Sequence, residues 1–374
     1  EVNQRKYFEA LSQGYQSIQQ SGSSDPEMFE MVQYRAFLQA LNYSLLLDDV
    51  TQRDMEVSKQ ELKQSLQTVY KQLDIRGKKE LKEMLKKNNV PYKDFLANHT
   101  SNLKVKKLIR GIQGSVQVTD QHVDNQFQQV NVSHILLKTY GQDEGAVKEK
   151  ADRIREALSG TLNFEEAVSL YSEDEDTKAQ GGDLGYIRIG SIVKPFEDVA
   201  FSLTQGEISQ PFKTVFGYHI VLLNGRFDLD KPEEIDYEAD KKRLTETYQR
   251  LALDAYITHL MDHADLQVID PSLKAAYSKY SRDFDGAIGG YQRMISQNPS
   301  SAVPHYLLSK LYILLGRSSD AILELEKADI KGTLNPAQDL PMAHILLGNL
   351  YVERLYSDRR LPKRTLQKIE KRLK

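Results

Sequence analysis

The apolar and aromatic residues of the first 113 positions recur with the spacing of amphipathic helices. In the segment that Asp25-Pro26 opens, they share one face at intervals of three and four positions: Met31, Tyr34, Leu38, Leu41 and Leu45. Similar spacing predicts further helices at residues 1–20, 60–73, 78–88 and 92–113. We therefore expect the chain to begin with an all-helical region.

The pattern changes at residue 132, where β-branched and aromatic side chains alternate or cluster over short runs. Val132–Lys138 and Phe216–Val221 are such runs, and each carries one histidine, His134 and His219. Runs of this composition are typical of strands. Between them lie two amphipathic helical patterns, a glycine-rich loop and a helix opened by Pro195, because proline suits the first helical turn. A mixed strand and helix region therefore follows the helical one.

Helical spacing returns at residues 237–261, followed by a short strand predicted at 266–269. Farther on, Ala287 and Ala321 lie 34 positions apart, and a pattern that begins at Leu308 restarts at Leu347. This region resembles tetratricopeptide repeats, whose helix pairs bury their faces by stacking on one another. We expect a final capping helix at 359–374. The repeats would form either a groove for a protein partner or a plain helical extension that stabilises the rest.

Length, composition and charge narrow the class of protein. The 374 residues suggest two or three domains, and 40% hydrophobic with 28% charged residues indicates a globular chain. The net charge of −3 argues against bulk nucleic-acid binding. The absence of cysteine excludes disulfides and zinc–thiolate sites, and fits a compartment that oxidises stray thiols. In the family that the helical segments resemble, described below, a short strand precedes a segment like residues 1–5. That resemblance implies that an N-terminal strand and any targeting or anchoring segment are missing from this sequence.

Four segments carry a close family resemblance: SHILLK at 133–138, YSED and KAQGGDLG within 171–185, KPFEDVAF at 194–201 and FGYHIV at 216–221. They resemble the parvulin-type peptidyl-prolyl cis-trans isomerase domain. The resemblance implies an α+β domain, a four-stranded antiparallel sheet with helices. Rotation of an X–Pro amide crosses a barrier of about 20 kcal/mol set by amide resonance, and no bond breaks. Such an enzyme needs no metal or cofactor, only a site that favours the twisted amide.

The resemblance also assigns the site. It implies a catalytic centre of His134, Asp174 and His219, and a substrate-binding set of Leu184, Ile192, Phe196, Thr214 and Phe216. Each residue also has a structural interpretation. The histidines could bond each other or Thr214 and hold the sheet together, since a buried polar group needs a partner. The acidic run that contains Asp174 could be a solvated loop, and the apolar residues could be plain core.

The helical segments resemble the SurA and PrsA type of extracytoplasmic foldase. The residues that carry this resemblance are FLQAL running into LLL at 37–47, VSKQEL at 57–62 and VQVTD at 116–120. It implies a parvulin domain inserted in an all-α chaperone domain and followed by an α-solenoid. The domain limits expected are 1–130 for the helical chaperone domain, 131–228 for the isomerase, 229–269 for a helix returning to the chaperone domain, and 270–374 for the repeats.

Charge distribution refines the expected substrate. Relatives that act on phosphorylated Ser-Pro or Thr-Pro carry a basic cluster after the first strand, whereas the loop at 140–145 has no Lys or Arg. Residues 131–228 hold ten basic and sixteen acidic residues, so an anionic phosphate would meet a repulsive field. By contrast, residues 76–110 hold eleven basic and three acidic residues. They form either a solvated face or a wall for acidic client segments or anionic lipid.

The sequence therefore predicts a bacterial, periplasmic or otherwise extracytoplasmic isomerase and chaperone that is not phospho-specific. Its expected partners are unfolded or nascent exported chains, including outer-membrane proteins, a protein at the repeats, and a membrane reached through the missing segment. One alternative is a catalytically inactive parvulin-fold chaperone or assembly factor that acts through client binding and the repeats. A second is a cytoplasmic adaptor built on the repeats.

Overall fold

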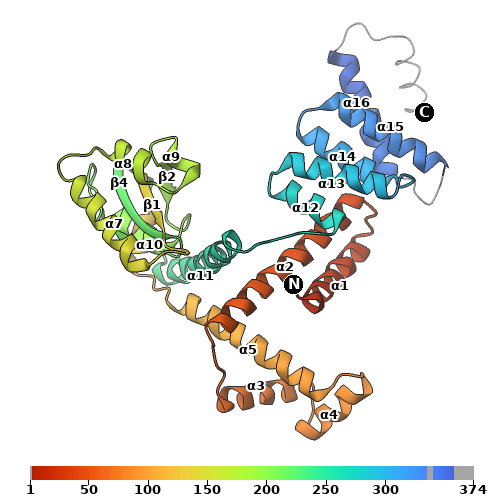
Figure 1. Ribbon diagram of the computed structural model, residues 1–374, viewed down its shortest axis with the longest axis horizontal. Coiled ribbons are helices and arrows are strands. Elements are labelled where there is room, and N and C mark those ends of the chain that lie inside the picture. Colours follow the sequence, from red (N-terminus) through yellow and green to blue (C-terminus); the bar gives the residue numbers. More distant parts are fainter. Residues whose placement is uncertain (1, 335–339, 358–374) are drawn as a thin grey trace. The chain divides into compact units, whose positions relative to one another are not determined.

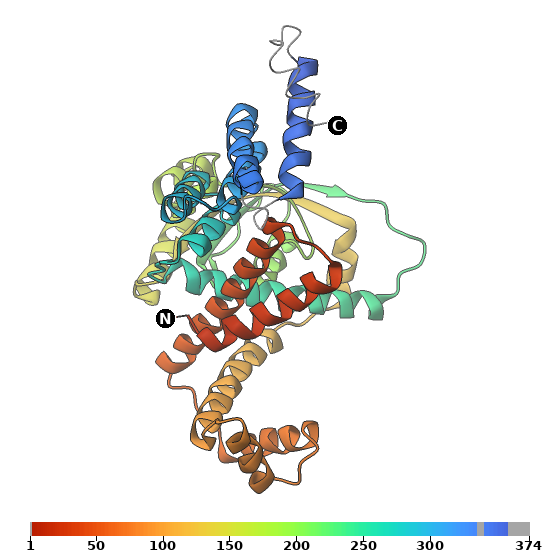
Figure 2. The same ribbon diagram turned by 90° about the vertical axis from the view of Figure 1, so that its right-hand side faces the viewer.

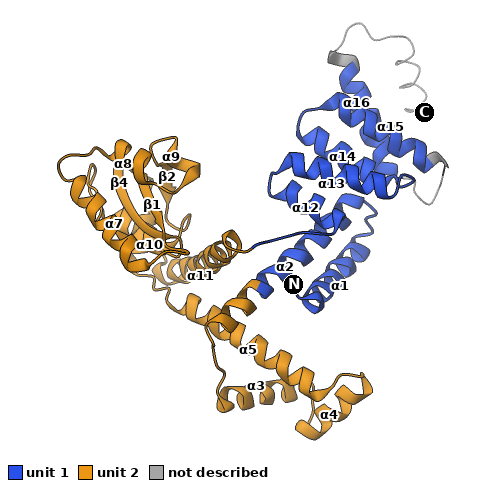
Figure 3. Ribbon diagram, in the orientation of Figure 1, with its two compact units in different colours: residues 1–44, 265–374 blue, residues 45–264 orange. Residues whose placement is uncertain are grey.

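The computed structural model describes residues 2–334 and 340–357, and the chain divides into two compact units (Figures 1 and 3). Unit 1 comprises residues 1–44 and 265–374, and unit 2 comprises residues 45–264. The division falls within one helix, α2 (Pro26–Gln52). The four domain limits expected from the sequence remain predictions. In the described part of the chain, no helix combines the length and the apolar character that a membrane span requires.

Unit 1 consists of helices, and those after residue 270 each pack on the next in sequence. The helices of this unit are α1 (Gln4–Ser21), the first part of α2, α12 (Pro271–Tyr280), α13 (Phe284–Gln297), α14 (Val303–Leu314), α15 (Ser318–Leu334) and α16 (Pro341–Ser357). The helices α1 and α2, drawn in red, lie side by side in both views (Figures 1 and 2). Gly14 permits this approach, because a Cβ there would lie 2.3 Å from Val32 Cγ1. The capping helix expected at 359–374 lies outside the described residues.

Ala287 and Ala321, 34 positions apart, are both fully buried in α13 and α15. They belong to one core that runs through the helix pairs and includes Tyr291, Tyr306 and Leu325. The strand expected at 266–269 is wrong, since these residues are irregular. Ile269 is 89% exposed, so nothing covers the apolar side chain that suggested a strand there.

Within unit 1, the first turns of α2 are bound by basic and phenolic side chains from α12 and α13. Lys279 Nζ lies 2.9 Å from Glu27 Oε1 and 2.9 Å from Glu30 Oε2. The Tyr291 hydroxyl donates to Glu30 Oε1 at 2.6 Å. Glu30 and Lys279 are 6% and 8% exposed, so this is a buried ion pair. The face of α12 and α13 that carries Lys279 and Tyr291 is therefore occupied by α2.

The helical part of unit 2 confirms four helices predicted from apolar spacing: α3 (Lys59–Gln72), α4 (Lys78–Lys87), α5 (Tyr92–Gly114) and α11 (Tyr237–Asp262). It also contains the short α6 (Asp120–Asp124), which was not predicted. The returning helix α11 packs along α5 and α6. Its Tyr256 donates a hydrogen bond to Asp49 Oδ2 at the end of α2, at 2.6 Å.

Between α6 and α11, the described residues form the predicted four-stranded antiparallel sheet, in the order β2-β1-β4-β3. The strands are β1 (Gln128–Lys138), β2 (Asp183–Arg188), β3 (Phe212–Lys213) and β4 (Gly217–Asp228). The helices are η1 (Asn125–Phe127), α7 (Glu144–Ala157), α8 (Phe164–Tyr171), α9 (Glu175–Lys178) and α10 (Lys194–Ser202).

The sheet is covered on both faces. Ile135, Leu137 and Ile220 pack with α7 and α8, whereas Val132 and Val221 pack with α10. This explains why β1 and β4 read as nearly continuous apolar runs. The chain enters and leaves the sheet at one place, because Leu229 N, just after β4, donates to Phe127 O, just before β1, at 2.7 Å. The α+β region is therefore inserted at a single point of the helical chain.

Candidate active site

His134 on β1 and His219 on β4 lie against each other on the α10 side of the sheet. Their rings are nearly parallel, with centroids 5.6 Å apart and an interplanar angle of 20°. Their Nδ1 atoms are 3.3 Å apart, within hydrogen-bond distance. The two residues are only 5% and 4% exposed. The pair therefore links the two central strands through buried polar atoms.

The second nitrogen of His134 reaches Asp174. Its Nε2 lies 2.7 Å from Asp174 Oδ2 and 3.3 Å from Thr177 Oγ1. Asp174 is the N-cap of α9, and its Oδ2 also accepts a 2.6 Å hydrogen bond from the Thr177 hydroxyl. The hydrogen bond from His134 lowers the pKa of Asp174 to about 2, so this carboxylate is charged at neutral pH.

The second nitrogen of His219 reaches Thr214. The Thr214 hydroxyl oxygen lies 2.8 Å from His219 Nε2 and accepts a hydrogen bond from Phe216 N at 3.1 Å. Burial, with a smaller effect of the neighbouring His134, lowers the pKa of His219 to about 3. His219 is therefore neutral at physiological pH.

These contacts define a hydrogen-bonded chain from Asp174 through His134 and His219 to Thr214. A carboxylate only accepts, so His134 Nε2 carries a proton. A neutral His134 then accepts at Nδ1 from His219 Nδ1–H, and His219 Nε2 accepts from the Thr214 hydroxyl. In this arrangement, each ring nitrogen of the two buried histidines has a hydrogen-bond partner.

Glycine fixes the backbone beside both histidines. Gly182 has φ +77°, and a Cβ there would lie 2.3 Å from His134 O. Its own carbonyl accepts from His134 N at 2.9 Å. Gly217 has φ +146°, and a Cβ there would lie 2.1 Å from Leu137 O. The backbone thus approaches β1 closely at Gly182 and Gly217, which explains why the GG and FG motifs carry glycine at these positions.

The predicted apolar residues gather on the same side of the sheet. Phe196 is 1% exposed and meets both imidazoles edge-on, with ring centroids 5.8 Å from His134 and 5.4 Å from His219. Leu184 and Ile192 are partly buried and pack against the cluster that contains Phe196. Phe216 is partly exposed, and its backbone N–H donates to the Thr214 hydroxyl oxygen, which places the residue beside this group. All eight predicted residues therefore belong to one neighbourhood.

Two residues of the site were not predicted. Thr177 follows Asp174 by three positions, a spacing at which a side chain can face a helix N-cap. Phe212 stacks on His219 at 5.5 Å and stands opposite it in the β3–β4 register. With only two residues, β3 is too short to leave an alternating pattern.

Comparisons with known proteins identify the region of the chain that contains this site. The rotamase family, described as the PPIC-type PPIASE domain, matches residues 134–225. Foldase protein PrsA 3 of Bacillus cereus is 28% identical over 265 residues, which cover 69% of this chain and 82% of that protein. Foldase protein PrsA 4 of the same organism is 31% identical over 227 residues, which cover 57% and 76%. The crystal structure of PrsA from Bacillus anthracis is 27% identical and covers 61% of this chain and 99% of that one, with a TM-score of 0.29.

The sheet, the paired histidines and the matched residues define a parvulin-type peptidyl-prolyl isomerase domain. The similarity to these relatives extends beyond that domain, over 265 and 227 residues. The chain belongs to the PrsA family of foldases.

Proposed function

We propose that the site formed by Asp174, His134, His219 and Thr214 catalyses prolyl isomerisation in unfolded chains outside the cytoplasm. The observation that carries this proposal is the continuous hydrogen-bonded chain beside a partly exposed apolar group. Leu184, Ile192 and Phe216 would enclose the proline ring, with Phe196 as the floor.

The proposed mechanism follows from the electronic structure of the amide. Twisting the X–Pro bond removes resonance, so charge leaves the carbonyl oxygen and the nitrogen regains its lone pair. An apolar enclosure favours the less polar twisted form over both planar forms. The charged Asp174 fixes the protons of both histidines, so the polar edge of the site is preorganised. No bond of the substrate is broken, and the residues only bind, orient and polarise.

The proposed substrate is an unmodified prolyl segment. The loop after β1 has no Lys or Arg. Nearby lysines are already paired: Lys150 Nζ lies 3.1 Å from Glu173 Oε1, and Lys213 Nζ lies 2.5 Å from Glu144 Oε2. A phosphate would therefore compete with carboxylates for these cations.

We also propose that the helical part of unit 2 holds unfolded clients. Helix α3 has no fully buried side chain, although Leu62, Leu66 and Val69 follow one stripe of it. A cleft of about 390 Å³ lies between α3 and α5, with Val69 and Leu103 among its apolar lining residues. The limits 1–130 with 229–269 for the chaperone domain belong to this proposal, as does a protein partner at residues 270–374.

Two experiments test these functions separately. Exchange NMR of a short prolyl peptide should show faster cis–trans exchange with the full chain, and an unchanged rate would refute the isomerase proposal. For the chaperone proposal, residues 128–228 are deleted and Phe127 is joined to Leu229, whose backbone atoms already meet. The remainder should fold and suppress aggregation of an unfolded client. A folded remainder without protective effect would refute it.

A further inference from the structure

Glu197 is a buried carboxylate that the mechanism above does not use. It is 1% exposed and directly follows Phe196 in α10. Three successive backbone amides donate to it: Gly190 N at 3.0 Å, Ser191 N at 2.9 Å and Ile192 N at 2.8 Å. The loop that ends at Ile192 is therefore wrapped around this one side chain.

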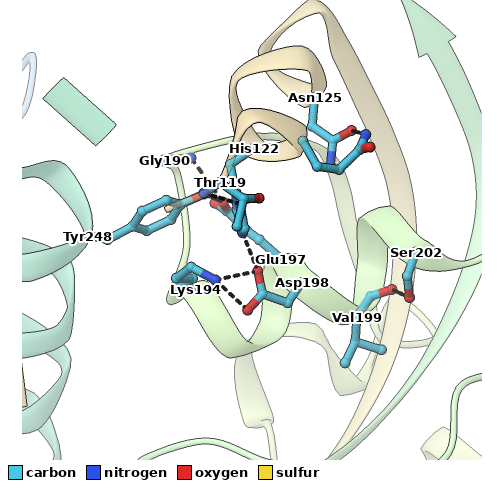
Figure 4. Close-up of polar contacts among 11 residues, drawn as sticks. Thr119, His122, Asn125, Gly190, Lys194, Glu197, Asp198, Val199, Ser202 and Tyr248 are labelled. Atoms are coloured by element: carbon cyan, nitrogen blue, oxygen red, sulfur yellow. Dashed lines mark hydrogen bonds and ion pairs between the residues drawn. The ribbon is translucent and has the colours of Figure 1, made fainter. Parts of the chain in front are cut away.

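A fourth donor to Glu197 comes from outside the isomerase domain. The hydroxyl of Tyr248, on α11, donates to Glu197 Oε2 at 2.5 Å (Figure 4). The four hydrogen-bond partners that Glu197 has in the described part of the chain are all donors. Glu197 can accept from all of them only as a carboxylate. Burial raises the pKa of Glu197, and the four hydrogen bonds oppose that effect. An ionised group held in this way is costly to leave without one of its partners.

Helix α11 also covers the loop through packing. Tyr248 is 1% exposed and shares a small core with Leu244, against which Ile189 packs. Gly190 has φ +83°, and a Cβ there would lie 3.3 Å from Thr247 Cγ2. The loop therefore lies against α11 at both a polar and an apolar contact.

A second polar link joins α10 to α6. His122 Nε2 lies 2.8 Å from Asp198 Oδ1, and Lys194 Nζ lies 2.7 Å from Asp198 Oδ2 (Figure 4). Thr119 N donates to His122 Nδ1 at 3.1 Å, so the proton of a neutral His122 is on Nε2 and points to Asp198. The helical part of unit 2 thus holds α10 near its start at two adjacent residues, Glu197 and Asp198.

We propose that Tyr248 is a positioning residue of the isomerase, which acts through Glu197 to hold the 190–192 loop and its pocket residue Ile192. The proposal rests on the function proposed for the site. It means that the proline pocket is completed by the helix that returns to the chaperone domain. Tyr248 does not touch the substrate and acts only on the shape of the pocket. Loss of its hydroxyl should therefore weaken substrate binding more than it slows rotation of the bound prolyl amide.

The test compares Tyr248→Phe with Tyr256→Phe in the full chain. Both replacements are on α11, and both remove a hydroxyl that donates to a carboxylate, Glu197 in one case and Asp49 in the other. Tyr248→Phe should raise KM for a prolyl peptide about three- to tenfold with kcat little changed, whereas Tyr256→Phe should leave both unchanged. Combined with Glu197→Gln, Tyr248→Phe should add no further increase.

Amide hydrogen exchange gives a readout that needs no activity. Gly190, Ser191 and Ile192 should exchange faster in Tyr248→Phe than in Tyr256→Phe at equal global stability. Equal exchange at these three amides in the two variants would overturn the positioning role. An inactive wild type that still shows the exchange difference would instead refute only the proposed isomerase function.

Discussion

Asp174 Oδ2 lies 2.7 Å from His134 Nε2, although Asp174 belongs to a run of four acidic residues that resembles a solvated loop. The Asp174 side chain is 18% exposed, whereas Glu175 and Asp176 point to solvent. One carboxylate of the run is therefore turned inward and sets the protons of the buried histidines.

The first prediction separates Asp174 from its neighbour. Asp174→Asn removes the charge that faces His134 and should lower kcat/KM about tenfold to a hundredfold, since a hydrogen bond to a charged group contributes about 1.5–3 kcal/mol. Asp176→Asn makes the same change on the same turn and should leave the rate unchanged. Peptide exchange rates and thermal melts of both variants check this, and equal rates for the two would contradict the role of Asp174.

The second prediction concerns pH. Because the pKa of His219 is about 3 in the folded chain and about 6.5 when unfolded, the unfolded state binds more protons between these values. Stability of the isomerase domain should therefore fall as pH decreases from about 6.5, by at most about 1.4 kcal/mol per unit. Asp174 acts in the same direction, but its contribution is present above its unfolded pKa of 3.8 and is lost only as pH falls toward 2.

Between pH 6.5 and 4.5 Asp174 contributes little, whereas Glu197, whose pKa burial raises, acts in the opposite direction to His219. The effect of His219 is therefore isolated by comparison with a variant that lacks only this imidazole. Denaturant unfolding of the isomerase domain, followed by its own amide signals, should show a shallower pH dependence for His219→Gln than for the wild type. Equal slopes would mean that His219 is not the buried neutral group described above.

Local patterns were sufficient to predict the two strands that carry His134 and His219, because strand alternation depends on neighbouring residues. The four-stranded sheet and the pairing of the two histidines were instead predicted from the resemblance to the parvulin family. The strand expected at 266–269 was wrong, because β-branched composition alone does not supply a pairing partner. The contact of Tyr248 with Glu197 spans 51 positions, and that of Lys279 with Glu30 spans 249. Such contacts leave no periodicity in the sequence and follow only from the packed fold.

The third prediction concerns the buried ion pair of unit 1. Lys279→Met leaves Glu30 without its cation at a site that is 6% exposed, and should cost about 3–5 kcal/mol. Lys310→Met is the matched control, since Lys310 also pairs with Glu27, at 3.0 Å, but its side chain is 27% exposed. That replacement should cost less than about 1 kcal/mol. Denaturant unfolding of unit 1 measures both, and equal costs would contradict the buried pair.

The fourth prediction concerns specificity. Matched peptides with Glu, phosphoserine or an apolar residue before proline should be isomerised with no advantage for phosphoserine, because the loop after β1 holds no cation. Raising the salt concentration should narrow any difference between the peptides, since screening weakens the repulsion from the acidic domain. A clear preference for phosphoserine would contradict the proposed substrate class.

The most direct measurement is the proline-limited refolding of an unfolded test protein. Prolyl isomerisation in such chains takes tens to hundreds of seconds, slow enough to limit folding. The full chain, added in substoichiometric amounts, should accelerate the slow phase in proportion to its concentration. Folded Phe196→Leu and Asp174→Asn variants should accelerate it much less, whereas Phe201→Leu, which replaces another buried ring of α10, should retain the effect. Equal acceleration by all variants would mean that the site described here does not carry the activity. No acceleration by the wild type would mean that the parvulin fold serves here only as a scaffold.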